Sequence, residues 1–93
     1  MIILEPKFSL GKTFATAAVT AWAECENIDL SKLMWKHHFG DWGDLGPEDK
    51  QANEEALTQG SRILSAYQIG DRKIYVITEM DRSMTTILFA SEY

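Results

Sequence analysis

The hydrophobic pattern of the chain changes its period in the last third, and this change limits the folds open to it. Three segments there are rich in β-branched and aromatic residues, as strands are: RILSAYQI (62–69), KIYVITE (73–79) and MTTILFA (84–90). Gly70-Asp71 fits a two-residue type II′ turn between the first two segments, and EMDRS (79–83) is a slightly longer loop between the second pair. The sequence therefore predicts an antiparallel meander of three strands.

Helical patterns come before the meander. The expected helices cover 17–26 after the N-cap Thr16, about 30–39 after the N-cap Asp29, and the residues from Pro47 to the stop at Gly60. Ahead of them, KFSLGKTFA (7–15) partly alternates and predicts an arm or short strand with a bend at Gly11. The expected fold class is α+β: an N-terminal arm or short strand, three short helices, then the three-stranded antiparallel meander.

The predicted strands carry bulk on both faces. The second strand places Ile74, Val76 and Thr78 on one face and Tyr75 and Ile77 on the other. Helices are expected to cover one face. The other is at least partly apolar, so either the N-terminal arm or a partner would have to cover it.

Length and composition predict one globular domain over residues 1–93, since 45% of the residues are hydrophobic. No apolar run is long enough for a membrane span, and the opening MIILEPKF lacks the basic leader of a signal peptide. Cys25 is the single cysteine, which excludes an intramolecular disulfide and a cysteine zinc site and favours a cytoplasmic location. We expect Cys25 to be an inert small hydrophobic residue of the first helix.

The net charge of −5 argues against a general nucleic-acid binder, which needs a basic patch, and permits a basic protein partner. Direct nucleic-acid binding is therefore not expected.

Chemistry-bearing residues gather in HHFGDWGDLGPEDK (37–50). His37 and His38 are neighbours on a helix, so they point about 100° apart and cannot share one ion. The acids do not follow the spacing of a calcium loop, and no metal is predicted. His37 with Asp41 would be the best catalytic dyad, but a histidine at the end of an apolar stripe is more often a packed residue.

Other residues of this region favour structural roles. Asp41 and Asp44 are expected to accept hydrogen bonds from backbone N–H groups in the loop and to cap the third helix. Trp42, between two glycines, is either a plug of the small core or an exposed anchor, and the plug is favoured. Asn53 would point inward and would need backbone partners in the loop or the meander.

If the hairpin tip 79–83 meets residues 37–49, an acidic, histidine-containing cleft with one arginine results. The candidate binding residues are His37, Asp41, Trp42, Asp44, Asp49, Asn53, Arg62, Glu79, Asp81 and Arg82. No catalytic residue and no cofactor is predicted.

Linked motifs along most of the chain resemble a family of small proteins of bacterial plasmids, integrative elements and phages. The matching motifs are H-x-x-GDWGDL (37–45), EDK-x-x-NE-x-AL-x-x-G (48–60), RILSAY (62–67), ITEMDRS-x-TTIL (77–88) and the terminal EY. Ala17-Ala18 stands where the family would have Pro-Gly, at a helix start. The resemblance implies a mobile genetic element expressed inside a bacterium, and it carries no established activity.

Two functions follow as hypotheses. The favoured one is a small non-enzymatic protein-binding module, with a counter-defence inhibitor of anti-CRISPR or anti-restriction type as its specific form. Its partner would be a host or element-encoded protein, with a homodimer as a further option. The alternative is a small hydrolase or ligand-binding protein with a His/Asp/Arg pocket between the GDWGD loop and the EMDRS hairpin.

Overall fold

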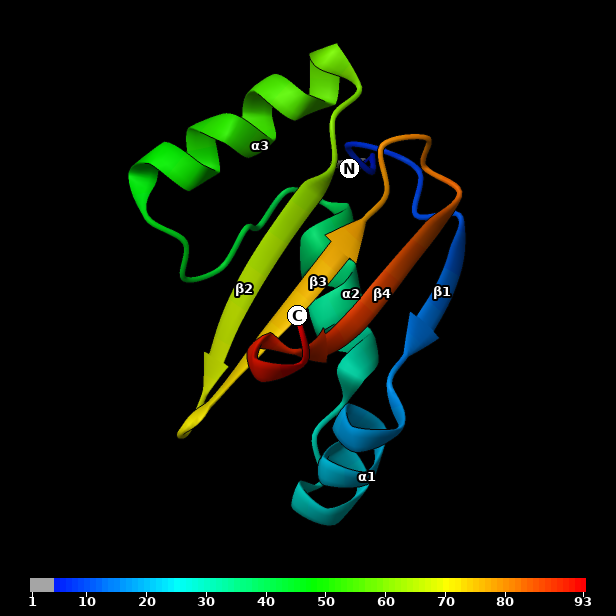
Figure 1. Ribbon diagram of the computed structural model, residues 1–93, viewed down its shortest axis with the longest axis vertical. Coiled ribbons are helices and arrows are strands. Elements are labelled where there is room, and N and C mark those ends of the chain that lie inside the picture. Colours follow the sequence, from blue (N-terminus) through cyan, green and yellow to red (C-terminus); the bar gives the residue numbers. More distant parts are fainter. Residues whose placement is uncertain (1–4) are drawn as a thin grey trace, which may run out of the picture.

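The computed structural model describes residues 5–93, so the expectation about the opening segment falls partly outside them. Its elements are β1 (Lys12–Ala15), α1 (Ala17–Glu26), α2 (Leu30–His38), α3 (Pro47–Gln59), β2 (Ile63–Ile69), β3 (Arg72–Thr78), β4 (Met84–Phe89) and the short 3-10 helix η1 (Ala90–Glu92). The fold is α+β, as predicted, with three helices and one four-stranded sheet (Figure 1). No helix among these residues has the length and apolar character that a membrane crossing requires.

The predicted caps define the helices. Thr16 accepts a hydrogen bond from Val19 N at 3.3 Å, and Asp29 accepts one from Ser31 N at 3.0 Å. The C-cap residues of α1 and α3 are Asn27 and Gly60, both with left-handed backbone. Local signals therefore set the helix bounds to within one residue of the prediction.

The sheet differs from the prediction. The meander β2-β3-β4 is antiparallel, but β1 pairs with β4 in parallel and gives the order β1-β4-β3-β2. The predicted meander is therefore present, but it is part of a four-stranded mixed sheet, because the N-terminal segment joins it as a parallel strand. Gly11, with φ of +65°, makes the pairing possible, because a Cβ there would lie 2.4 Å from the Ser83 carbonyl.

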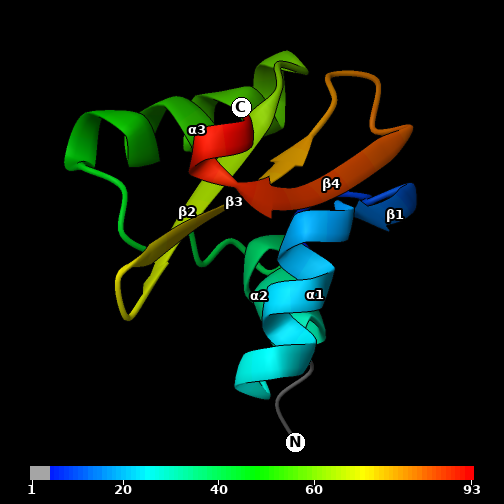
Figure 2. The same ribbon diagram turned by 60° about the horizontal axis from the view of Figure 1, so that its bottom comes forward.

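Helices cover both faces of the sheet (Figure 2). α1 and α2 lie on one face, where Val19 and Leu33 pack against Ile74, Val76 and Ile87. α3 and η1 stand over part of the opposite face, which we call the outer face. The N-terminal arm does not cover this face, because it joins the sheet as an edge strand.

Helix α1 buries only one narrow side against the sheet. Val19 and Ala23 are buried and Trp22 is half-buried, but Ala18 and Cys25 are exposed. The expectation of Cys25 as a packed small hydrophobic residue is therefore wrong, because Cys25 lies on another side of α1 from the buried Val19 and Ala23.

The loop before α3 runs beside the free edge of β2. Gly43 forms an isolated parallel bridge with Ala66. Its φ is +76°, and a Cβ at this position would lie 2.0 Å from the Ala66 carbonyl oxygen. This position therefore requires glycine both for its backbone conformation and for the close approach.

We expect Gly43→Ala to lower the free energy of unfolding by about 1–3 kcal/mol through left-handed backbone strain alone. The clash of the new Cβ with the Ala66 carbonyl oxygen adds to this loss. Urea unfolding followed by tryptophan fluorescence measures this loss. Gly46→Ala is the matched control, since a Cβ added at Gly46 would have no atom within 4 Å and the φ of Gly46 is −68°. The control should lose at most about 1 kcal/mol as a poorer N-cap, and equal losses in the two variants would contradict the close approach.

Candidate functional site

His37 lies at the end of α2 and is completely buried against the sheet. Its Nδ1 is 2.5 Å from Ser65 Oγ, and its Nε2 is 2.9 Å from Thr78 Oγ1. Both ring nitrogens are therefore hydrogen-bonded, and His37 is a packed histidine, as the sequence predicted.

The hydrogen bonds around His37 have one consistent direction. Thr85 Oγ1 donates to the Leu10 carbonyl at 2.7 Å, so Thr85 accepts from Thr78 across 2.6 Å. Thr78 in turn accepts from His37 Nε2–H, and Ser65 donates to Nδ1. We assign the neutral Nε2–H tautomer on this ground. We call this chain from Ser65 to Leu10 the His37 network.

Electrostatics agree with that assignment. Burial, with a smaller contribution from the neighbouring His38, lowers the pKa of His37 to about 3. The imidazole is therefore neutral near pH 7. With no exposed surface and no unpaired nitrogen, it cannot reach a substrate as the ring now stands.

Residues 42–44 pair with the edge of β2 that does not bond to β3. Ala66 N donates to the Trp42 carbonyl at 3.2 Å, and Asp44 N donates to the Ala66 carbonyl at 2.7 Å. The Asp44 carboxylate accepts from Gln68 N at 2.8 Å. Asp44 therefore serves a backbone N–H of β2, and the N-cap of α3 is Gly46, without a side-chain bond. The prediction that the loop acids cap this helix is wrong.

Asn53 of α3 completes this edge. Its Nδ2 donates to the Leu64 carbonyl at 2.7 Å, and its Oδ1 accepts from Leu64 N at 3.2 Å. The buried carboxamide thus pairs like a strand residue, with the meander, one of its two expected partners. We call Asn53 and residues 42–44 together the edge cap.

Asp41 and Tyr67 hold the turn that leads into the edge cap. Asp41 Oδ1 accepts from Gly43 N at 3.1 Å, as predicted for an Asx turn. Tyr67 donates its hydroxyl to the Asp41 carbonyl at 2.6 Å. Burial is the main cause that raises the pKa of the Tyr67 phenol, so it stays a donor.

Phe8 fills the space where the sequence predicted a cleft. Trp42 is 5% exposed, in agreement with its interpretation as a plug, and stacks on Phe8 with ring centroids 6.1 Å apart. Phe8 also meets the edge of His37 at 5.1 Å and lies 5.9 Å from the guanidinium of Arg82. The GDWGD loop and the EMDRS hairpin therefore approach Phe8 from two sides, and its ring separates them.

Arg82 binds main-chain carbonyls rather than the acids of the loop. Its Nη1 donates to Ser61 O at 2.7 Å, to Glu79 O at 3.1 Å and to Met80 O at 3.3 Å, and its Nη2 donates to Ala56 O at 3.0 Å. The guanidinium thus joins the C-terminal end of α3 to the hairpin, where the helix dipole favours a cation.

The remaining candidates are spread out. Asp81 is exposed and accepts from Ser83 N at 3.0 Å, and the hydrogen bonds from Ser83 lower its pKa. The guanidinium of Arg62 lies over the Tyr93 ring, 5.1 Å from its centroid. The ten predicted residues therefore do not line one cleft.

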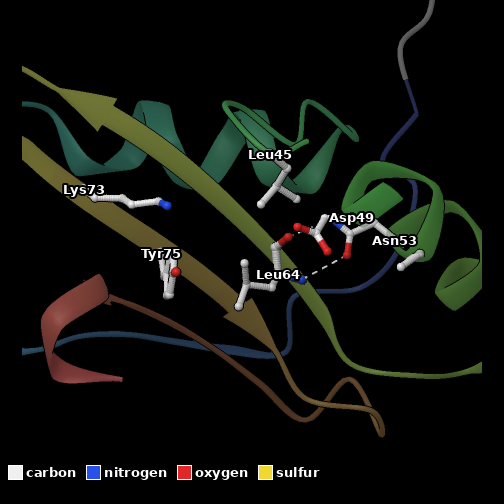
Figure 3. Close-up of a pocket in the computed structure, with 7 residues that line it drawn as sticks. Leu45, Asp49, Asn53, Leu64, Lys73 and Tyr75 are labelled. Atoms are coloured by element: carbon white, nitrogen blue, oxygen red, sulfur yellow. Dashed lines mark hydrogen bonds between the residues drawn. The ribbon is translucent and has the colours of Figure 1, made fainter. Parts of the chain in front are cut away.

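A groove of about 360 Å³ lies between α3 and the outer face (Figure 3). Its lining consists of Leu45, Asp49, Ala52, Asn53, Leu64, Lys73 and Tyr75. Asp49 and Asn53 come from the predicted set. Lys73 and Tyr75 were missed as site residues, although the sequence did place Tyr75 on the second face of its strand.

A second surface was missed altogether. Trp35 of α2 is 60% exposed, and its ring centroid is 4.4 Å from that of Phe39. Trp35, Ser31, Lys32 and Lys36 line a shallow hollow of about 410 Å³. We call Lys32, Trp35, Lys36 and Phe39 the α2 surface. Their i, i+3, i+4, i+7 spacing, opposite the apolar stripe, was the available signal.

The His37 network predicts a pH dependence of stability. An unfolded histidine takes up a proton as the pH falls below 6.5, whereas His37 in the fold resists until about 3, so the free energy of unfolding falls between these values. The slope should reach about 1.4 kcal/mol per pH unit. In His37→Gln this contribution disappears, which chemical denaturation at pH 7.5, 6.5 and 5.5 measures.

His38→Gln is the control for this slope. His38 is half-buried, and burial lowers its pKa as well, so its loss should remove only a minor part of the slope. A His37→Gln protein with an unchanged slope would show that His37 is not the buried neutral group.

No group of three or more His, Cys, Asp or Glu side chains in residues 5–93 is placed to hold a metal ion. Comparisons of the chain with protein-family models, with curated proteins and with solved structures gave no significant match. Function has to be inferred from the side chains themselves.

Proposed function

We propose that this protein acts by binding another protein, and that the α2 surface is its contact. Trp35 is the observation that carries this proposal. A tryptophan that is 60% exposed leaves much apolar area in water, and tryptophan is strongly enriched among the residues that dominate binding energies.

The charges around Trp35 define the partner. Lys32 and Lys36 line the same hollow as Trp35, in a chain whose net charge is −5. A complementary surface would accept the indole in an apolar pocket and carry acids at its rim. This local charge selects a different partner from the basic one that the net charge alone permits.

The polar residues of the predicted candidate set support binding over catalysis. Both nitrogens of His37 are bonded, Asn53 is occupied by Leu64, and Arg82 is occupied by carbonyls. A general base needs a free lone pair within reach of its substrate, and His37 offers none in this arrangement.

The resemblance to proteins of plasmids and phages supplies the setting of the proposal. A protein of this kind would act in the bacterial cytoplasm, and its target would be a host or element-encoded protein. Inhibition of a defence complex of restriction or CRISPR type is the specific form that we propose.

A lysine-reactive cross-linker applied in host cells, followed by mass spectrometry, tests this function. We expect one partner cross-linked through Lys32 or Lys36 to the wild-type protein, with recovery at least about tenfold lower for Trp35→Ala, as expected for an anchor residue. Met80→Ala is the matched control, since Met80 is 65% exposed at the hairpin. Equal recovery with Trp35→Ala would contradict the proposal.

The groove beside α3 supports ligand binding as a second candidate function. Its 360 Å³ lies near the lower end of the range for small-molecule sites, and Lys73 supplies a cation beside the apolar Leu45 and Leu64. A small aromatic carboxylate fits this lining. Benzoate should shift the amide resonances of Leu64 and Tyr75 in the wild-type protein and leave them unchanged in Lys73→Ala. No shift in the wild-type protein at millimolar benzoate would rule out this ligand class.

A further inference from the structure

One edge of the sheet is paired with other residues of the described chain, and the other edge is open. The edge cap occupies the outer side of β2. β1 forms the opposite edge, and all four of its residues are exposed. Figures 1 and 2 both show no element beyond β1 within the described part of the chain.

The pairing with β4 fixes which groups of β1 are free. Lys12 N donates to Ser83 O and Thr16 N donates to Ile87 O, so the even-numbered residues of β1 bond to β4. In a parallel ladder the alternate residues point the other way. Thr13 and Ala15 therefore direct an N–H and a C=O each away from the sheet.

We propose that a second copy of the chain pairs with this edge, with the two β1 strands antiparallel around a twofold axis at Phe14. Thr13 then lies opposite Ala15 of the second copy, and Ala15 opposite its Thr13. These are hydrogen-bonded pairs, because both residues carry the outward groups, so every outward N–H and C=O of β1 has a partner. The two sheets become one continuous sheet.

The side chains match in the same register. Phe14 lies opposite Phe14 of the second copy in a non-hydrogen-bonded pair, the closer of the two kinds. Phe14 is 47% exposed, and Met84, in register with Lys12 on the same outer face, is 40% exposed. An antiparallel pair therefore brings the two exposed Phe14 rings together, whereas Met84 stays one strand further in, on β4. Aromatic pairs across strands stabilise sheets.

Charge complementarity favours a second copy over an unrelated strand. In this register Lys12 lies opposite Thr16 of the second copy. Thr16 Oγ1 donates to Glu92 Oε1 at 3.0 Å, so the carboxylate of Glu92 stands at that position on the outer face. The symmetry gives two such Lys–Glu pairs. A strand from another protein would have to carry this acid and the aromatic residue independently.

The edge is short, and the dimer is accordingly weak. Four strand residues from each copy bury less than the ~1,000 Å² of a stable interface, so we expect a dissociation constant in the range of ~10–500 µM. The dimer does not use the α2 surface, so the Trp35→Ala protein should dimerise like the wild type.

Sedimentation equilibrium of the full chain from about 10 µM to 1 mM tests the proposal. We expect a monomer–dimer equilibrium in the wild-type protein that Thr13→Pro weakens at least tenfold, because proline removes an outward N–H without touching the bonds to β4. Lys12→Glu should weaken it as well, by placing two acids together. Lys50→Glu, the same charge reversal on α3, is the control and should dimerise like the wild type.

Three results would overturn the proposal. One is a wild-type protein that remains monomeric to 1 mM. The second is a dimer that neither Thr13→Pro nor Lys12→Glu weakens, since it would use another surface. The third is equal weakening by Lys50→Glu, which would show a general charge effect. Thermal unfolding of each variant shows that it is folded, and should Thr13→Pro fail to fold, Lys12→Glu against Lys50→Glu decides.

Discussion

The outer edge of β2 requires hydrogen-bond partners for its backbone, and the central part of the chain is organised around supplying them. Leu64, Ala66 and Gln68 present N–H groups away from β3, and Asn53, Trp42 and Asp44 accept from them. An open edge invites pairing with other chains, so closing it also protects the sheet. The unusual composition of residues 37–50 is explained largely by this task, since one glycine has to touch the strand and two acids accept backbone hydrogen bonds.

The His37 network imposes a second constraint from within the core. It joins α2 to β2, β3 and β4 and ends on the N-terminal arm at Leu10. A half-satisfied buried network would be costly in so small a core, but here each member has a partner. The same completeness that makes the network stabilising removes His37 from chemistry.

Local sequence signals predicted the helices and the hairpin turn. They did not predict the pairing of strands that lie far apart in the chain. Thr16, Asp29 and Gly60 act within one turn of their helices, so the helix bounds could be read from the sequence. The turn at Gly70 could be read for the same reason: its φ is +61°, and Asp71 has no positive φ, as a type II′ turn requires. The pairing of β1 with β4 joins residues about seventy positions apart, and no pattern in either segment encodes it.

The same difference between local and non-local contacts explains why the candidate site was predicted only in part. The hydrogen-bonding tasks of Asp41 and Asn53 follow from their residue types and neighbouring turns, and both were foreseen. The cleft was not realised, because Phe8, thirty-four positions before Trp42, occupies it. The binding roles of the ten candidate residues stay predictions.

Helix α2 connects the structural and the proposed functional parts of the molecule. The side of α2 that faces the sheet carries Leu33 and His37, which are buried, and the side that faces solvent carries Trp35. The network fixes the rotation of the helix, because His37 has to meet Ser65 and Thr78 at once. A rotation of the helix that hid Trp35 would break both bonds and leave buried polar groups unpaired. The exposed indole is therefore held in place by the buried imidazole on the same helix, and such preorganisation lowers the entropy lost when a partner binds.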